Sequence, residues 1–123
     1  MRTQGLTHIH LMVRSLERVL TFYTRVFALK EQFREGPSMV FLNTPGRDDM
    51  VTLNEDPRGA AMAGVNGGIH HFGFRLGEGG DIEAAIREVE AAGGTLVRRG
   101  EHAPGVPFAY VRDPDGYVIE LLR

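Results

Sequence analysis

The 123-residue chain contains no cysteine and no tryptophan, and Lys30 is its only lysine. The absence of cysteine excludes disulfide bonds, thiolate zinc sites, iron–sulfur clusters and cysteine nucleophiles. With 14 basic and 16 acidic residues the net charge is −2, which predicts no nucleic-acid partner and no anionic membrane surface. No apolar run reaches membrane-spanning length, and no apolar signal segment follows Met1. We therefore expect a soluble, cytoplasmic protein.

The motifs of several common enzyme classes are also missing. The two serines, Ser15 and Ser38, do not lie in Gly-x-Ser-x-Gly, so the sequence predicts no serine hydrolase of that type. There is no His-Glu-x-x-His, no Walker loop and no Gly-x-Gly-x-x-Gly. The acidic stretch 113–116 fails as a calcium loop, because Val111 and Leu122 would occupy its first and twelfth ligand positions. A tight turn is the better interpretation.

An internal repeat organises the chain, whose length fits one domain over residues 1–123. Apolar alternation and helical periodicity predict the same order, βαβββ, in a first module (5–55) and a second module (69–123). The Gly- and Ala-rich stretch Asp56–Gly68 is expected to link them. The fold class is therefore α+β. The predicted elements are Leu6–Val13, the helix Leu16–Leu29, Lys30–Glu35, Ser38–Asn43 and Met50–Asn54, then Ile69–Leu76, the helix Asp81–Ala92, Thr95–Arg99, Pro107–Arg112 and Tyr117–Leu122.

Two histidines and a carboxylate fall on corresponding strands of the two halves. His8 and His71 each lie in the strand before a helix, and strand alternation turns both, with Glu120, away from the apolar face. Two imidazoles and a carboxylate form a metal site with open positions for substrate, and they suit Fe(II), Mn(II), Ni(II), Co(II) or Zn(II). The alternatives are structural histidines and a salt bridge from Glu120 to an arginine. His70 is interpreted as a core or edge residue, and His102 as an exposed loop residue.

Three stretches carry a resemblance to a known family. They are His8–Arg18 leading into Phe22-Tyr23, then Ile69–Leu76, then Tyr110–Leu121. The sequence resembles the vicinal oxygen chelate superfamily, which includes glyoxalase I, bleomycin- and fosfomycin-resistance proteins, methylmalonyl-CoA epimerase and extradiol dioxygenases. The resemblance covers nearly the whole chain. It implies paired βαβββ modules forming a cupped, mixed sheet.

The resemblance also implies a site and a reaction. His8, His71 and Glu120 fall on the family's metal-ligand positions, and the repeat places Thr52, a poor ligand, in the remaining position. Three ligands with an open face favour a ring-cleaving extradiol dioxygenase with Fe(II) acting on a small substrate with vicinal oxygens. Tyr110 matches that group's active-site tyrosine, and His10 is the second candidate catalytic residue. The alternatives are a glyoxalase-like lyase or isomerase and a non-catalytic bleomycin-type binding protein.

The expected assembly is a homodimer. One βαβββ module forms only part of a barrel, and its ligand-bearing sheet face needs a second sheet. Homologues of similar length pair the first half of one chain with the second half of another. The sequence leaves open whether the modules pair within one chain or between subunits.

Overall fold

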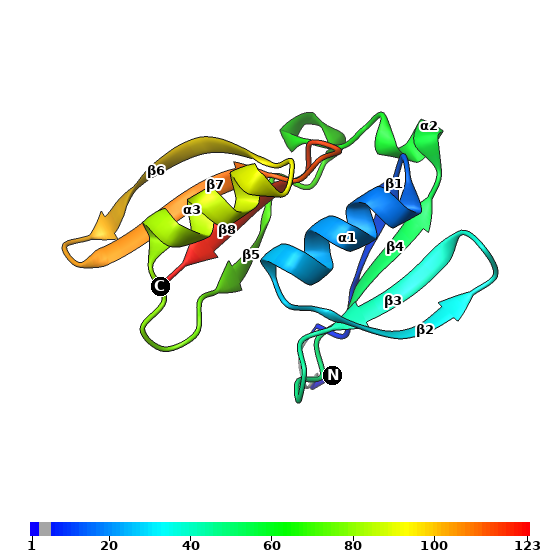
Figure 1. Cartoon of the computed structure of the whole chain (residues 1–123), viewed down its shortest axis with the longest axis horizontal. Coiled ribbons are helices and arrows are strands. Elements are labelled where there is room, and N and C mark those ends of the chain that lie inside the picture. The colour runs from blue at the N-terminus through cyan, green and yellow to red at the C-terminus, as the bar shows by residue number, and fades with distance from the viewer. Residues whose placement is uncertain (3–5) are drawn as a thin grey trace. The chain divides into compact units, whose positions relative to one another are not determined.

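The computed structural model describes residues 1–2 and 6–123, so position 5, where the first module was expected to begin, lies outside the described residues. The chain divides into two compact units, Met1–Ala61 and Met62–Arg123. Each unit contains one four-stranded mixed sheet with a long helix on one of its faces (Figure 1). The described residues form eight strands and three α-helices, which confirms the predicted α+β fold class.

Unit 1 has the strand order β1-β4-β3-β2. Its elements are β1 (Ile9–Val13), α1 (Leu16–Val26), β2 (Lys30–Glu35), β3 (Met39–Asn43), β4 (Val51–Glu55) and the short α2 (Pro57–Ala60). The core lies between α1 and one face of the sheet. On that face Leu11, Val40 and Leu53 are fully or almost fully buried, because the periodic apolar positions of α1 pack against them.

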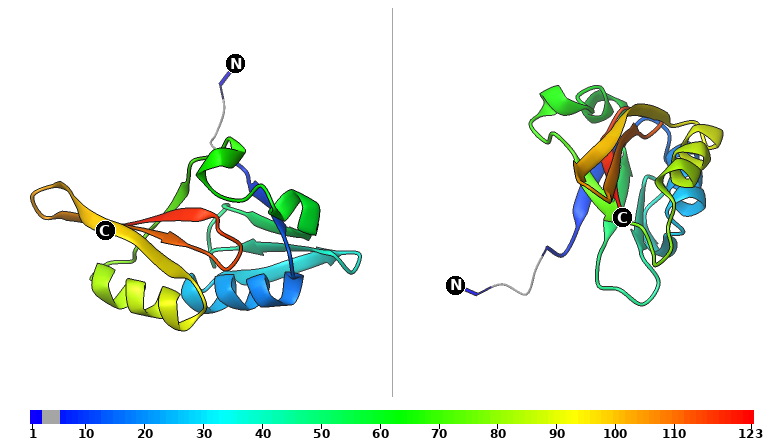
Figure 2. Two further views of the ribbon diagram at one scale, coloured as in Figure 1. Left: turned by 90° about the horizontal axis from the view of Figure 1, so that it is seen from above. Right: turned by 90° about the vertical axis from the view of Figure 1, so that its left-hand side faces the viewer.

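Unit 2 repeats this arrangement with the order β5-β8-β7-β6. Its elements are the 3-10 turn η1 (Val65–Gly67), β5 (Phe72–Arg75), α3 (Ile82–Ala91), β6 (Thr95–Ala103), β7 (Val106–Arg112) and β8 (Val118–Leu122). Figure 2 shows α3, in yellow-green, running along one side of this sheet. Its buried residues Ile86 and Val89 belong to the same core as Val111, Ile119 and Leu121 of the sheet.

The strand register of the two units is equivalent, as the repeat predicts. In unit 1 the parallel pair β1–β4 aligns Ile9 with Val51, and in unit 2 the parallel pair β5–β8 aligns Phe72 with Ile119. Thr52 therefore occupies the position in β4 that Glu120 occupies in β8. Both residues lie on the face of their sheet that is opposite the long helix, which we call the front face.

The segment between the modules differs from the expected linker. Asp56 accepts hydrogen bonds from the backbone N–H groups of Arg58 and Gly59, and Pro57 occupies the first helical turn, so α2 forms directly after β4. Gly59 packs so closely on Met12 that an added Cβ would lie 2.7 Å from Met12 Cγ. Part of the stretch predicted as a linker therefore belongs to unit 1.

Helix α1 begins where predicted but ends earlier and is capped differently. Ser15 makes no side-chain capping bond, and the carboxylate of Glu55 on β4 instead accepts a hydrogen bond from Leu16 N at 2.7 Å. The helix ends at Val26 because Ala28 adopts a left-handed conformation with φ +53°, which a continuing helix cannot contain. The predicted end at Leu29 was therefore three residues too late.

Candidate active site

A row of polar residues crosses the front face of the unit 2 sheet. Cross-strand pairing aligns Arg98 of β6 with Tyr110 of β7, Tyr110 with Glu120 of β8, and Glu120 with Gly73 of β5. Residues that pair directly across strands project to the same face. The row therefore gathers a cation, a phenol and a carboxylate on the front face. Gly73 adds no side chain beside Glu120.

The carboxylate of Glu120 lies between two imidazoles. Oε2 is 3.4 Å from Nε2 of His71, which directly precedes β5, and Oε1 is 2.7 Å from Nε2 of His102 on β6. The Glu120 side chain is only 12% exposed, whereas those of His71 and His102 are 30% and 45% exposed. The structure thus brings together His71, Tyr110 and Glu120, three of the five site residues predicted from the sequence.

The surroundings of Glu120 and Tyr110 shift their pKa values in opposite directions. Burial pushes the pKa of Glu120 upward, but hydrogen bonds with His102 and Tyr110 and the charges of His71 and His102 outweigh it, so the pKa lies below its ordinary value. The pKa of Tyr110 is raised, first by burial and then by the hydrogen bond with Glu120 and its negative charge. At neutral pH the site therefore holds an ionised carboxylate beside a neutral phenol.

Contacts between aromatic rings connect the side chains around Glu120 to one another. The ring of Tyr110 meets His71 edge-on at 5.0 Å and Phe108 at 5.3 Å between centroids. Phe108 in turn stacks on His102 at 4.2 Å with an interplanar angle of 18°. Since His71 and His102 both contact Glu120, these five side chains form a closed network that restricts each member's rotamer.

His102 is the site residue that sequence reasoning missed. It was expected in an exposed loop, but β6 continues to Ala103, which pairs with Val106 across the turn at Pro104-Gly105. Because the predicted strand ended at Arg99, strand alternation could not assign the His102 side chain to either face of the sheet. Placing the turn at Pro104-Gly105 would have put His102 two and four residues from Gly100 and Arg98, and so on the front face.

His8 and His71 share a local arrangement although they belong to different units. Each directly precedes its strand, β1 or β5, because these strands begin later than predicted. Thr7 Oγ1 lies 2.9 Å from Nδ1 of His8, and Nδ1 of His70 lies 2.8 Å from Nδ1 of His71. His70 is exposed, which excludes the core position that its core-or-edge interpretation allowed. In both pairs the preceding side chain contacts Nδ1, and in His71 the other ring nitrogen, Nε2, faces Glu120.

The corresponding row of unit 1 has different chemistry. Pairing aligns Phe33 of β2 with Phe41 of β3, Phe41 with Thr52, and Thr52 with His10 of β1. Phe33 and Phe41 stack at 4.3 Å, and His10 is exposed. Thr52 is fully buried, and its Oγ1 has no hydrogen-bond partner among the described residues. The residue in Glu120's equivalent position is therefore a buried, unpaired hydroxyl.

In the part of the chain that the structure describes, no group of three His, Asp or Glu side chains is already arranged as a metal site. The chemistry of His71 and Glu120 nevertheless fits a divalent cation, because an imidazole nitrogen faces a carboxylate oxygen on a partly open sheet face. No helix among the described residues has the length and apolarity needed to span a membrane.

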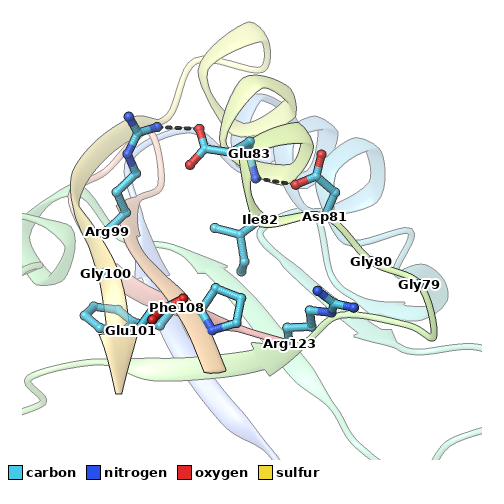
Figure 3. Close-up of a pocket in the computed structure, with 11 residues that line it drawn as sticks. Gly79, Gly80, Asp81, Ile82, Glu83, Arg99, Gly100, Glu101, Phe108 and Arg123 are labelled. Atoms are coloured by element: carbon cyan, nitrogen blue, oxygen red, sulfur yellow. Dashed lines mark hydrogen bonds and ion pairs between the residues drawn. The ribbon is translucent and has the colours of Figure 1, made fainter. Parts of the chain in front are cut away.

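A cavity of about 490 Å³ lies elsewhere in unit 2, beside the first turn of α3. Figure 3 shows Arg99 and Glu83 paired at this cavity, with Ile82 between them and Phe108. Neither Glu120, Tyr110 nor His71 lines it. We therefore locate the candidate site by its convergent side chains on the front face rather than by this hollow.

The names of the curated relatives include two enzyme activities, lactoylglutathione lyase and catechol-2,3-dioxygenase. The chain is 29% identical over 126 residues to a lactoylglutathione lyase of Arabidopsis thaliana and 30% identical over 120 residues to a catechol-2,3-dioxygenase of Bacillus subtilis, in each case over 94% of this chain. It spans only 43% and 41% of those two proteins. A probable lactoylglutathione lyase of Vibrio cholerae is 28% identical over all of this chain and 93% of its own.

Solved structures share the fold. A glyoxalase-related enzyme from Fulvimarina pelagi matches 98% of this chain and 88% of its own with a TM-score of 0.79 and 21% identity. A genomically encoded fosfomycin resistance protein from Listeria monocytogenes matches 98% of this chain and 93% of its own with a TM-score of 0.76 and 21% identity. A family model matches residues 5–121. The chain belongs to the glyoxalase/bleomycin resistance protein/dioxygenase superfamily.

Proposed function

We propose that this protein is a metal-dependent enzyme that acts on a small substrate with two adjacent oxygens, most similar in reaction to a ring-cleaving extradiol dioxygenase. The metal ligands are His8, His71 and Glu120, and Fe(II) is the favoured ion. The observation that carries the proposal is the cluster of His71, Tyr110 and Glu120 on one sheet face, with an ionised carboxylate among partly exposed imidazoles.

The equivalence of the two repeats supports His8 as the third ligand. His8 and His71 both directly precede the first strand of their unit, and in both the preceding side chain contacts Nδ1. A metal-ligating histidine usually has its second ring nitrogen engaged in this way, because that contact fixes the tautomer and the ring orientation. When bound, the metal would supply Lewis-acid polarisation of the substrate's oxygens.

The protein's own groups have distinct roles in this proposal. Tyr110, whose raised pKa keeps its phenol neutral, forms a hydrogen bond with a substrate hydroxyl. His10 lies on the front face of unit 1 and is exposed, so its imidazole is available to exchange a proton with substrate. The apolar pair Phe33 and Phe41 offers an aromatic surface to a flat substrate.

A glyoxalase-like lyase or isomerase is the second candidate, favoured by the names of several relatives. The argument against it is Thr52, which occupies the position equivalent to Glu120 and is buried with no polar partner in the part of the chain that the structure describes. A neutral hydroxyl there is a poor metal ligand and a poor general base, because its proton is not lost at neutral pH.

The two reactions are distinguished by one pair of assays. The protein is reconstituted anaerobically with Fe(II) and offered a panel of catechols with and without O₂. We expect O₂-dependent ring cleavage that Glu120→Ala abolishes and Glu101→Ala retains, since Glu101 is an exposed carboxylate on the same strand as His102. Turnover of the methylglyoxal–glutathione adduct at ordinary enzyme rates, without catechol cleavage, would establish the lyase instead.

Metal content provides a test that does not depend on the substrate. After chelator treatment and reloading, we expect one divalent ion per site in the wild-type protein. His8→Ala, His71→Ala and Glu120→Ala should each lose it, whereas Glu101→Ala should keep it. Stoichiometric, wild-type binding in the Glu120 variant would show that the assignment is wrong.

We further propose that the protein is a homodimer with each metal site shared between subunits, His8 coming from one chain and His71 with Glu120 from the other. Mixing and refolding His8→Ala with Glu120→Ala chains tests this. A shared site predicts that a heterodimer recovers one intact site, because its other site collects both substitutions. No recovery from a refolded, dimeric mixture would show that each site is built within one chain.

A further inference from the structure

Arg98 lies at the end of the row that contains Tyr110 and Glu120. It pairs across β6 and β7 with Tyr110, and its guanidinium carbon is 5.3 Å from the ring centroids of both Phe108 and Tyr110. The residue is exposed. Two aromatic rings therefore hold the guanidinium on the front face, next to the phenol that the proposed function uses.

The partners of Arg98 distinguish it from other arginines of the chain. Arg99, one residue on and on the opposite sheet face, forms an ion pair with Glu83 (Figure 3). Arg34 of unit 1 is paired with Glu17 and with the neighbouring Glu31. Among the described residues no carboxylate pairs with Arg98, so aromatic rings support its position while its N–H groups stay available.

Gly100, two residues along the strand from Arg98, lets the Phe108 ring pack close to the sheet beside the guanidinium. This glycine pairs with Phe108, and a Cβ added to it would lie 3.2 and 3.3 Å from two atoms of the Phe108 ring. The ring therefore lies over Gly100 and no side chain from that position covers the guanidinium. Two strand spacings separate Arg98 from Glu120, roughly 10 Å between backbones, which one small substrate can bridge.

A planar guanidinium fork matches the two oxygens of a carboxylate or phosphonate and forms charge-assisted hydrogen bonds with them. We propose that Arg98 binds an anionic group of the substrate, whose vicinal oxygens lie at the His71–Glu120 end of the row. The substrate class is thus a small oxyanion that also carries two adjacent oxygens, such as a dihydroxylated aromatic acid. This inference rests on the proposed function for the location of the vicinal oxygens.

The first experiment compares two probes that differ by one carboxylate group. Catechol and 3,4-dihydroxybenzoate are titrated into the Zn(II)-loaded protein by calorimetry, because Zn(II) permits no oxidation. We expect the carboxylate to bind about tenfold more tightly than catechol, the difference that one charge-assisted hydrogen-bonded pair supplies. Arg98→Gln should abolish this preference and leave catechol binding unchanged, whereas Arg99→Gln should keep it. A preference that persists in Arg98→Gln would overturn the inference.

The second experiment separates this inference from the proposed function. Benzoate, phenylphosphonate and phenol are added in turn to the metal-free protein while the Nε–Hε signals of the arginine side chains are followed by NMR. We expect the two anions, and not phenol, to shift the Arg98 signal, and their relative affinities distinguish a carboxylate from a phosphonate. A shift at Arg98 without catechol binding would sustain the anion site and contradict the proposed reaction. Anions that shift Arg98 no more than Arg99 would refute the site itself.

Discussion

Nε2 of His102 contacts Oε1 of Glu120 at 2.7 Å, although the two residues are 18 positions apart and lie on different strands. β7 runs between β6 and β8, so the contact reaches across a whole strand. His102 is held for this contact by stacking on Phe108, a residue of the intervening strand. One oxygen of the carboxylate is thereby fixed, and the other faces His71.

We predict that His102 positions Glu120 for metal binding. His102→Ala should lower the affinity for Zn(II) about tenfold or more, as loss of a group that orients a ligand commonly does. His102→Gln, which keeps a hydrogen-bonding group, should restore part of the loss. Calorimetric titration measures both variants beside Glu101→Gln as the control. Unchanged affinity in His102→Ala would mean that Glu120 is oriented by Tyr110 alone.

The orphaned hydroxyl of Thr52 predicts a stabilising substitution. Valine has nearly the same shape as threonine, so Thr52→Val removes a fully buried Oγ1 for which residues 1–2 and 6–123 supply no hydrogen-bond partner. The free energy of unfolding should rise by about 1 kcal/mol, because burying an unpaired polar group is costly. Urea denaturation measures the change. Thr24→Val is the matched control, since Thr24 donates to Leu20 O at 2.9 Å and its replacement should bring no gain.

Glu55 is predicted to stabilise α1 from a distant part of the chain. Its carboxylate accepts from Leu16 N, 39 residues earlier, and also lies at the positive end of the helix dipole. Glu55→Ala should cost about 1 kcal/mol of unfolding free energy, and Glu55→Gln, which keeps an acceptor, should cost less. Glu35→Ala, at an exposed position of β2, serves as the control. Equal midpoints for the two alanine variants would contradict a capping role.

Replacing Ala28 by glycine is predicted to stabilise the protein, whereas a glycine substitution usually destabilises one. Its φ of +53° is strained for a residue with a Cβ, so Ala28→Gly should raise the free energy of unfolding by about 1 kcal/mol. The same change at Ala84, inside α3, should lower it by a similar amount because glycine disfavours a helix interior. Thermal unfolding of both variants tests the pair. A destabilised Ala28→Gly protein would show that the loop tolerates alanine without strain.

The repeat and the faces of the strands could be predicted from sequence because they depend on local periodicity. Alternation in 119–121 assigned Glu120 to the front face, and β8 agrees. The two long helices followed from their apolar spacing in the same way. Alternation failed at His70 because that residue precedes its strand, and the period of two applies only within a strand.

Local periodicity could not predict features that depend on contacts between residues far apart in the sequence. The capping of α1 by Glu55 joins a strand to a helix, and the contact of His102 with Glu120 joins two different strands. Each requires the strand order and register before the two side chains can be placed together. The end of α1 at Ala28 was missed for another reason, since a left-handed alanine has no sequence signal comparable to glycine.

The two units carry different side chains at equivalent positions of the same strand arrangement. Three positions carry Phe33, Phe41 and Thr52 in one copy and Arg98, Tyr110 and Glu120 in the other. A duplicated module can keep its chemistry in one copy while the other is released to vary. Laboratory evolution of a second reactive surface could therefore begin with a library confined to the three positions of unit 1, leaving both helix-covered cores unchanged.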